Sequence, residues 1–165
     1  MSLVTESGAG SATAESYISV ADADTRHAAF GNTAWAALTT SAKEIALRKA
    51  TAYMVQSYRT RWLGERINST QALDWPRWGA VVGCYTIPSD EVPVTVADAC
   101  ADLALKASTD ELSPDLERAV IREKVGPLET EYSPYGQRNT TYTAIDAILA
   151  PFLTGSGCMV RVGRA

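Results

Sequence analysis

The sequence predicts an all-α protein, a small helical bundle of about four to five helices with an extended strand-like arm and flexible N- and C-terminal segments. Apolar residues recur at helical spacing over most of the chain, helix-start signals precede several of these stretches, and a single stretch alternates like a strand. The 165 residues, of which 46% are hydrophobic and 21% charged, suffice for one domain with its own core.

The chain divides into an N-terminal arm, a helical domain and a tail. Residues 1–18 are rich in Ser, Thr, Ala and Gly without periodicity, so we expect a loosely held arm. Gly8-Ala9-Gly10 lacks the strand and the third glycine of a phosphate-binding loop, and is interpreted as flexible. The helical domain is expected over residues 19–153 and the tail over residues 154–165.

Two helices are predicted in the first half of the domain. Ser19 is the predicted N-cap of a helix that Gly31-Asn32 ends. Ser41 and Glu44 match a capping box, which opens a longer helix that runs to about Arg61 or Trp62. The aromatic residues of this helix have core spacing and are expected to be buried: Tyr53, Tyr58 and Trp62.

Residues 64–92 are expected to form an ordered loop that packs on the helices, because turn residues interrupt the periodicity while large apolar residues persist. Pro76 fixes the chain directly after Trp75, so Trp75, Pro76 and Arg77 are predicted to anchor this loop. Three roles are open for the Arg77 side chain, namely stacking on Trp75, stacking on Trp78 or pairing with a carboxylate.

In the second half of the chain, the sequence predicts a helix, an extended arm and a last helix. Pro93 suits the first position of a helix, and a short helical turn is expected over Leu112–Val120. Residues 121–133 form the extended arm, since Gly126-Pro127 excludes a helix and apolar residues alternate with glutamates. No partner strand is evident, so this arm is expected to pair with another subunit. The last helix is predicted over Thr143–Leu153.

The arm and the tail supply the candidate partner-binding residues. A Gly-rich hinge precedes an apolar and basic end, which indicates either a segment that docks on a partner or a frayed terminus. The candidates are Lys124, Leu128, Glu129 and Tyr132 in the arm, with Met159, Val160, Arg161 and Val162 in the tail.

The polar residues argue against an enzyme or a metal site. The single histidine, His27, excludes a Cys/His metal cluster and is expected at the edge of the helical core. Asp98 and Asp102 share a helix face and are able in principle to hold a cation, although a solvated acidic stripe is favoured. We expect no catalytic residues and no cofactor. The three cysteines are expected as free, buried thiols in a reducing compartment: Cys84, Cys100 and Cys158.

The net charge of −4 hides a separation of charge along the chain. Seven basic and three acidic residues lie between Lys43 and Arg77, whereas four basic and eleven acidic residues lie between Asp90 and Glu131. Such a separation favours head-to-tail contacts between copies in a ring, and chance is the alternative.

Six landmarks occur in order along nearly the whole chain: Ala14–Ser19 (AESYIS), Gly31 with Trp35, Leu47–Thr51 (LRKAT), Gln71–Arg77 (QALDWPR), Ser89–Pro93 (SDEVP) and Glu123–Tyr132 (EKVGPLETEY). This set resembles a family of small tailed-phage proteins that are often labelled DnaT-like single-stranded-DNA-binding proteins. The family occurs among phage morphogenesis products and is similar in size and helical content to head-to-tail connector, or adaptor, proteins. It offers no catalytic residues.

The resemblance implies a structural virion protein, an adaptor that forms a homo-oligomeric, dodecameric ring in the neck. Its partners are the portal protein and the next tail or neck component, and duplex DNA passes through the ring without specific binding. The protein is expected in the virion and, during assembly, in the host cytoplasm. No membrane contact is expected, because no apolar run approaches the roughly 18 residues that a bilayer requires.

The alternative is a single-stranded-DNA-binding replication accessory. Its candidate surface is the basic stretch from Lys43 to Arg77, which carries several aromatic residues. The acidic net charge and the core spacing of those aromatics argue against it.

Overall fold

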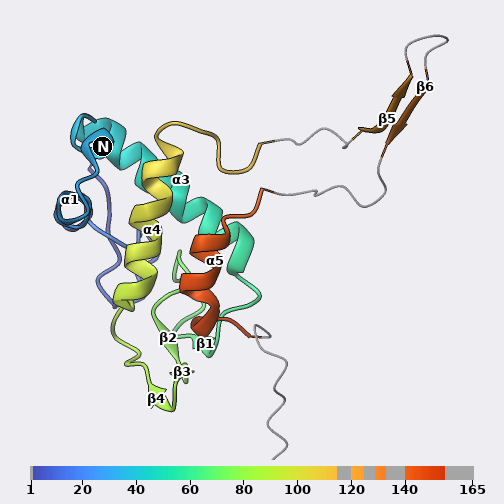
Figure 1. The fold of residues 1–165 in the computed structure, drawn as a ribbon. Helices are drawn as coiled ribbons and strands as arrows, with labels where there is room; N and C mark the ends of the chain where they lie inside the picture. The colour runs from blue at the N-terminus through green and yellow to red at the C-terminus, as the bar shows by residue number, and fades with distance from the viewer. Residues whose placement is uncertain (1, 115–119, 125–128, 133–139, 155–165) are drawn as a thin grey trace, which may run out of the picture.

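The structure is a computed structural model that describes residues 2–114, 120–124, 129–132 and 140–154. Its helices are α1 (Val20–Ala29), α2 (Thr33–Ala36), α3 (Thr40–Tyr58), α4 (Val94–Ala107), α5 (Thr143–Leu149) and the 3-10 turn η1 (Ala150–Phe152). Helix α4 packs against α1, α3 and α5 (Figure 1). Among the described residues, none of these helices has the length and apolar character needed to cross a membrane.

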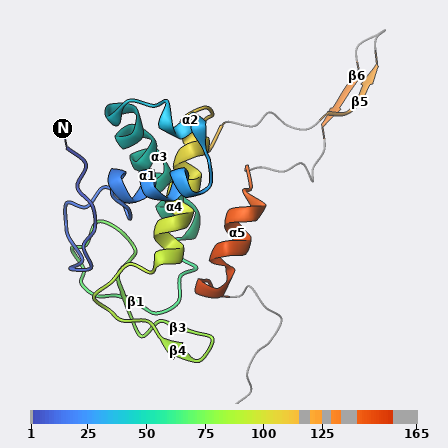
Figure 2. The same ribbon diagram turned by 60° about the vertical axis from the view of Figure 1, so that its left-hand side comes forward.

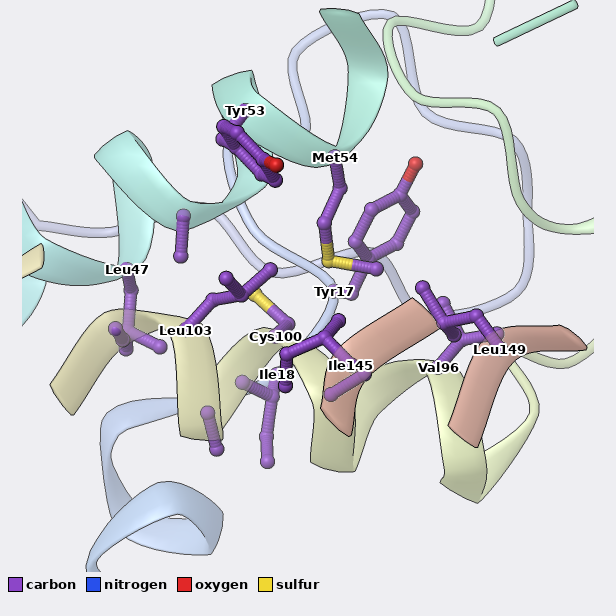
Figure 3. Packing of buried hydrophobic residues seen from close by; sticks show 14 of the residues in the cluster. Tyr17, Ile18, Leu47, Tyr53, Met54, Val96, Cys100, Leu103, Ile145 and Leu149 are labelled. Carbon is purple, nitrogen blue, oxygen red and sulfur yellow. The ribbon is translucent and has the colours of Figure 1, made fainter. Parts of the chain in front are cut away.

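The core lies where α3, α4, α5 and the end of the N-terminal segment meet. Small residues of α4 let its neighbours approach closely, since Ala99, Ala101 and Ala104 are fully buried. Figure 3 shows larger side chains from each element pointing toward one another: Tyr17 and Ile18, Leu47 and Met54 of α3, Cys100 and Leu103 of α4, and Ile145 and Leu149 of α5.

Helix starts follow local capping chemistry. The prediction for Ser19 is confirmed, because its Oγ accepts a hydrogen bond from the Asp22 amide at 3.1 Å. The capping box at Ser41 is wrong. Thr39 is the N-cap and accepts from the Ala42 amide at 3.3 Å, while Glu44 instead lies 3.6 Å from Arg48 one turn later.

The all-α prediction is wrong, because the described chain also contains three two-stranded antiparallel sheets. The pairs are β1 (Glu65–Arg66) with β2 (Arg77–Trp78), β3 (Val81–Val82) with β4 (Tyr85–Thr86), and β5 (Val120–Lys124) with β6 (Glu129–Tyr132). Gly83 and Cys84 have φ values of 58° and 73°, which suits the two-residue turn of a tight hairpin. Two-residue strands are too short to show alternation in a sequence.

The two strands of the extended arm pair with each other within the chain. Strand β6 pairs with β5 in a register that places Lys124 opposite Glu129 and Val120 opposite Tyr132. The helical turn predicted to reach Val120 is also wrong, because Val120 begins β5. The alternating stretch was interpreted as one strand, whereas its two ends pair with each other.

The N-terminal segment is packed, so the expectation of a loose arm is wrong. Thr5 forms a parallel bridge to Ser16, and the Glu6 side chain is buried. The Glu6 carboxylate accepts hydrogen bonds from the backbone amides of Gly8, Gly10 and Ser11 at 2.8–3.0 Å. The glycines therefore wrap a carboxylate of their own segment and do not form a flexible loop. Residues 155–165 of the predicted tail lie outside the described residues.

Candidate nucleic-acid interface

Several basic residues of the Lys43–Arg77 stretch are neutralised within the chain. Lys43 Nζ lies 2.9 Å from Asp24 Oδ1, and Arg48 Nη2 lies 3.0 Å from Glu15 Oε2. The hydrogen bond from Arg48 holds the pKa of Glu15 below its usual value. These two cations therefore balance acidic residues of α1 and of the N-terminal segment.

The acidic pair of α4 is occupied by an arginine. Arg26 of α1 lies 2.8 Å from Asp98 Oδ2 through Nη1 and 2.8 Å from Asp102 Oδ2 through Nη2. These contacts, led by the hydrogen bond to Asp102, raise the pKa of Arg26. The pair is neither a cation site nor a freely solvated stripe. Within the described residues, no group of three or more His, Cys, Asp or Glu side chains is arranged to hold a metal ion.

His27 lies in the core, next to Trp35, as its spacing predicted. Its Nε2 lies 3.1 Å from the Ala101 carbonyl oxygen, and its Nδ1 lies 3.0 Å from Asn32 Nδ2. A carbonyl accepts and an amide nitrogen donates, so the neutral ring with its proton on Nε2 satisfies both contacts. Burial lowers the pKa of His27. The His27 side chain is therefore part of the packed core, with both ring nitrogens hydrogen-bonded.

The aromatic residues of the α3 stretch are buried, which confirms the expectation for Tyr53, Tyr58 and Trp62. Tyr58 donates a hydrogen bond to Asp146 Oδ1 of α5 at 2.7 Å. Trp62 meets the fully buried Trp75 edge to face at 5.8 Å. These rings join the helices to the loop and are not accessible to nucleic-acid bases.

Two other aromatic side chains are exposed. Trp78 in β2 is 67% exposed and Tyr85 in β4 is 79% exposed, with Val81 of β3 between them in sequence at 49%. Figures 1 and 2 place β1 to β4 together at one end of the molecule, away from α1 and α2. These two rings give this end of the molecule aromatic contact area that is open to a partner.

The exposure of Trp78 follows from the alternation of side chains along β2. Arg77 is buried and Trp78 is exposed, so the two side chains point to opposite faces of the strand. An apolar residue in the predicted packed loop is expected to face the helices, and Trp78 does not. Gly79, with a φ of 71°, marks the turn that follows Trp78.

Arg77 fills none of the roles considered for it. Its Nε donates to the Leu63 carbonyl at 2.7 Å, its Nη1 to the Asp74 carbonyl at 3.2 Å, and its Nη2 to the Gly64 carbonyl. Burial lowers the pKa of Arg77. Trp75 is fully buried and joined to Pro76 by a cis peptide bond. Whether these residues anchor the loop energetically stays a prediction.

Three arginines from the end of α3 through β1 keep accessible charge. Arg61, directly after α3, is exposed and has no ion-pair partner among the described residues, and the same holds for the half-buried Arg66 of β1. Arg59 bonds to Asp74, but its side chain remains 50% exposed. We group Arg59, Arg61, Arg66, Trp78 and Tyr85 under the name arginine–aromatic face. Within it, Arg66 lies opposite Arg77 across the β1–β2 pair, whereas Glu65 lies opposite Trp78.

A family model described as "Putative DnaT-like ssDNA binding protein" matches residues 1–165. The chain belongs to this DnaT-like family. No curated protein and no solved structure matches the chain. The family match therefore agrees with the DnaT-like label of the resemblance and gives no support to its head-to-tail connector part.

The residues predicted to bind partners are not part of the arginine–aromatic face of this DnaT-like chain. Lys124 ends β5, and Glu129 and Tyr132 begin and end β6. The remaining candidates lie outside the described residues: Leu128, Met159, Val160, Arg161 and Val162.

The cysteines differ in exposure. Cys100 is buried on α4, with its Sγ 3.3 Å from Thr51 Oγ1, as expected. Cys84 is exposed in the β3–β4 turn, so the expectation of a buried thiol is wrong there. Cys158 lies outside the described residues.

Proposed function

We propose that the protein binds single-stranded DNA through the arginine–aromatic face. The observation that carries this proposal is the exposure of Trp78 and Tyr85 in a segment that also carries arginines with accessible charge. Proteins that bind single strands combine aromatic rings, on which bases stack, with cations that follow the phosphates. The family match supports the same class of ligand.

The face suits a single strand better than a duplex. Bases in a duplex already stack on one another, so an exposed ring gains contact only with unstacked bases. The cationic part is small, and the net charge of −4 opposes DNA at a distance. Contacts of Arg59, Arg61 and Arg66 with about three phosphates give a slope of log affinity against log salt near −2.

Fluorescence anisotropy with a labelled oligonucleotide at low salt tests the proposal. Trp78→Ala and Tyr85→Ala are each expected to weaken binding about fivefold or more, because stacking on an aromatic side chain contributes about 1–3 kcal/mol per base. Phe30→Ala is the matched control, since Phe30 is also 67% exposed but follows α1. Its affinity should equal that of the unmodified protein.

Two results would overturn the proposal. One is the absence of binding to any oligonucleotide at low salt. The other is equal affinity of the Trp78→Ala and Phe30→Ala variants, which would show that the exposed ring at β2 does not contact DNA. Far-UV circular dichroism of each variant checks that the fold is retained.

The adaptor role stays a prediction, together with the dodecameric ring, the portal and neck partners, the passage of duplex DNA and the virion location. The extended arm was one reason for it, and that arm pairs within the chain. Native mass spectrometry of the protein with a portal protein tests the ring. The proposed function involves no chemical step and therefore no catalytic residue or cofactor.

A further inference from the structure

A cavity of about 470 Å³ opens beside β1 and β2, at the edge of the arginine–aromatic face. Its lining includes Arg59, Arg66, Asn68, Asp74 and Arg77. Cavities of this size are typical of small-molecule sites. Trp78 follows Arg77 directly in β2, but its side chain points to the other face of that strand.

Two buried polar atoms of the cavity residues lack a hydrogen-bond partner among the described residues. They are Asp74 Oδ2, an acceptor, and Arg66 Nε, a donor. Asp74 is fully buried, and such groups in native proteins almost always have a partner. The residues that line the cavity therefore include one unused acceptor and one unused donor, both shielded from water until a neighbouring side chain moves.

We propose, on the basis of the proposed function, that this cavity binds a guanine base of the single strand through Asp74 and Arg66. A carboxylate only accepts hydrogen bonds, and it repels a phosphate, which offers only acceptors. The base edge must therefore bring donors to Asp74.

Guanine is the base whose Watson–Crick edge places two donors, N1–H and N2–H, side by side, with the O6 acceptor next to them. The two donors match the two oxygens of Asp74, and O6 matches an Arg66 donor. Adenine and cytosine set a ring acceptor beside their amino group, and thymine sets two carbonyls around its single N–H. Each of these bases places an acceptor against the carboxylate.

Arg59 controls access to Asp74. Its Nε donates a hydrogen bond to Asp74 Oδ1 at 3.1 Å and forms an ion pair with that carboxylate. Because the Arg59 side chain is 50% exposed, it is able to rotate into solvent. Its departure frees the second carboxylate oxygen for the base, and the guanidinium then meets the neighbouring phosphate.

The test measures base preference with three labelled oligonucleotides, thymine tracts that carry guanine, hypoxanthine or thymine at one central position. Hypoxanthine keeps O6 and N1–H but lacks the N2 amine. The unmodified protein should bind the guanine oligonucleotide about fivefold or more tighter than the thymine one, since a bidentate base contact discriminates at least to this extent. The hypoxanthine oligonucleotide should fall between them.

Asp74→Asn should abolish the preference, because the amide offers one acceptor and no charge. Asp90→Asn removes the same charge from an exposed residue outside the cavity and should keep the preference. If Asp74→Asn does not fold by circular dichroism, Arg66→Met replaces it and should lose the guanine preference.

The outcomes separate the two proposals. Equal, measurable affinity for all three oligonucleotides overturns the guanine pocket and leaves the proposed function standing. A guanine preference that survives in both Asp74→Asn and Arg66→Met also overturns the pocket. The absence of binding to every oligonucleotide overturns the proposed function and the pocket together.

Discussion

The loop between α3 and α4 has an inner side that packs on the helices and an outer side that faces solvent. Both sides carry tryptophan and arginine, but these residues are buried on the inner side and exposed on the outer side. On the inner side, Trp75 is fully buried and Arg77 donates to three backbone carbonyls. On the outer side, Trp78 is 67% exposed and Arg61 has no ion-pair partner among the described residues. Residue type alone therefore does not separate the structural residues of this loop from its accessible ones, whereas burial and satisfied hydrogen bonds do.

The inner side also supports the outer side. Strands β1 to β4 have two residues each, and hairpins this short are marginal on their own. Arg77 links β2 to the segment directly before β1 through the carbonyls of Leu63 and Gly64. We therefore expect inner-side substitutions to unfold the loop and outer-side substitutions to affect binding alone.

The two tryptophans test this comparison with the largest expected effect. Trp75→Ala should lower the free energy of unfolding by about 3–5 kcal/mol, because it removes a fully buried ring that contacts Trp62 and Phe152. Trp78→Ala should change it by about 0.5 kcal/mol or less. Urea denaturation followed by circular dichroism measures both, and similar losses for the two variants would break the comparison.

Arg77 and Arg61 are expected to show a smaller difference in the free energy of unfolding. Arg77→Met should cost about 2–3 kcal/mol in urea denaturation, because buried carbonyls lose charged donors. Arg61→Ala should leave stability within about 0.5 kcal/mol. It should also reduce the salt slope of oligonucleotide binding by about 0.7, the loss of one phosphate contact.

Lys49→Ala is the matched control for Arg61→Ala, since Lys49 is an exposed cation of α3 about ten residues, or roughly 15 Å along a helix, before Arg59. It should leave the salt slope unchanged. A slope reduced equally by both substitutions would show that the arginines act through net charge and not through a defined site.

The helices were predictable because their signals are local. The Ser19 cap identified α1, and the spacing of Leu47, Met54 and Tyr58 identified the buried face of α3. The Thr39 cap was missed because Ser41 with Glu44 offers an equally good capping pattern two residues later. Glu44 does not complete that pattern, because its carboxylate lies against Arg48 one turn later.

The candidate site was less predictable because it depends on contacts between distant segments. Charge counting placed a basic region at Lys43–Arg77, but Glu15 and Asp24 neutralise part of it from earlier in the chain. The exposure of Trp78 depends on a two-residue strand that no periodicity reveals. Asp98 and Asp102 have the spacing of a possible cation site, but Arg26 of α1 forms ion pairs with both of them.

The smallest expected effect concerns pH and separates the helical core from the arginine–aromatic face. Burial lowers the pKa of His27, the single histidine of the chain. Below about pH 6.5 the unfolded chain binds a proton that the folded chain does not, so stability falls with decreasing pH, by at most about 1.4 kcal/mol per pH unit.

His27→Gln should remove this slope between about pH 7 and pH 5, as measured by urea denaturation at each pH. The carboxylates with lowered pKa, Glu15 and Asp24, contribute only at more acidic pH. The arginine–aromatic face contains no histidine, so oligonucleotide affinity of the folded protein should stay constant across this pH range. An affinity that falls in parallel with stability, and that His27→Gln restores, would show that the core and the face are coupled and not independent.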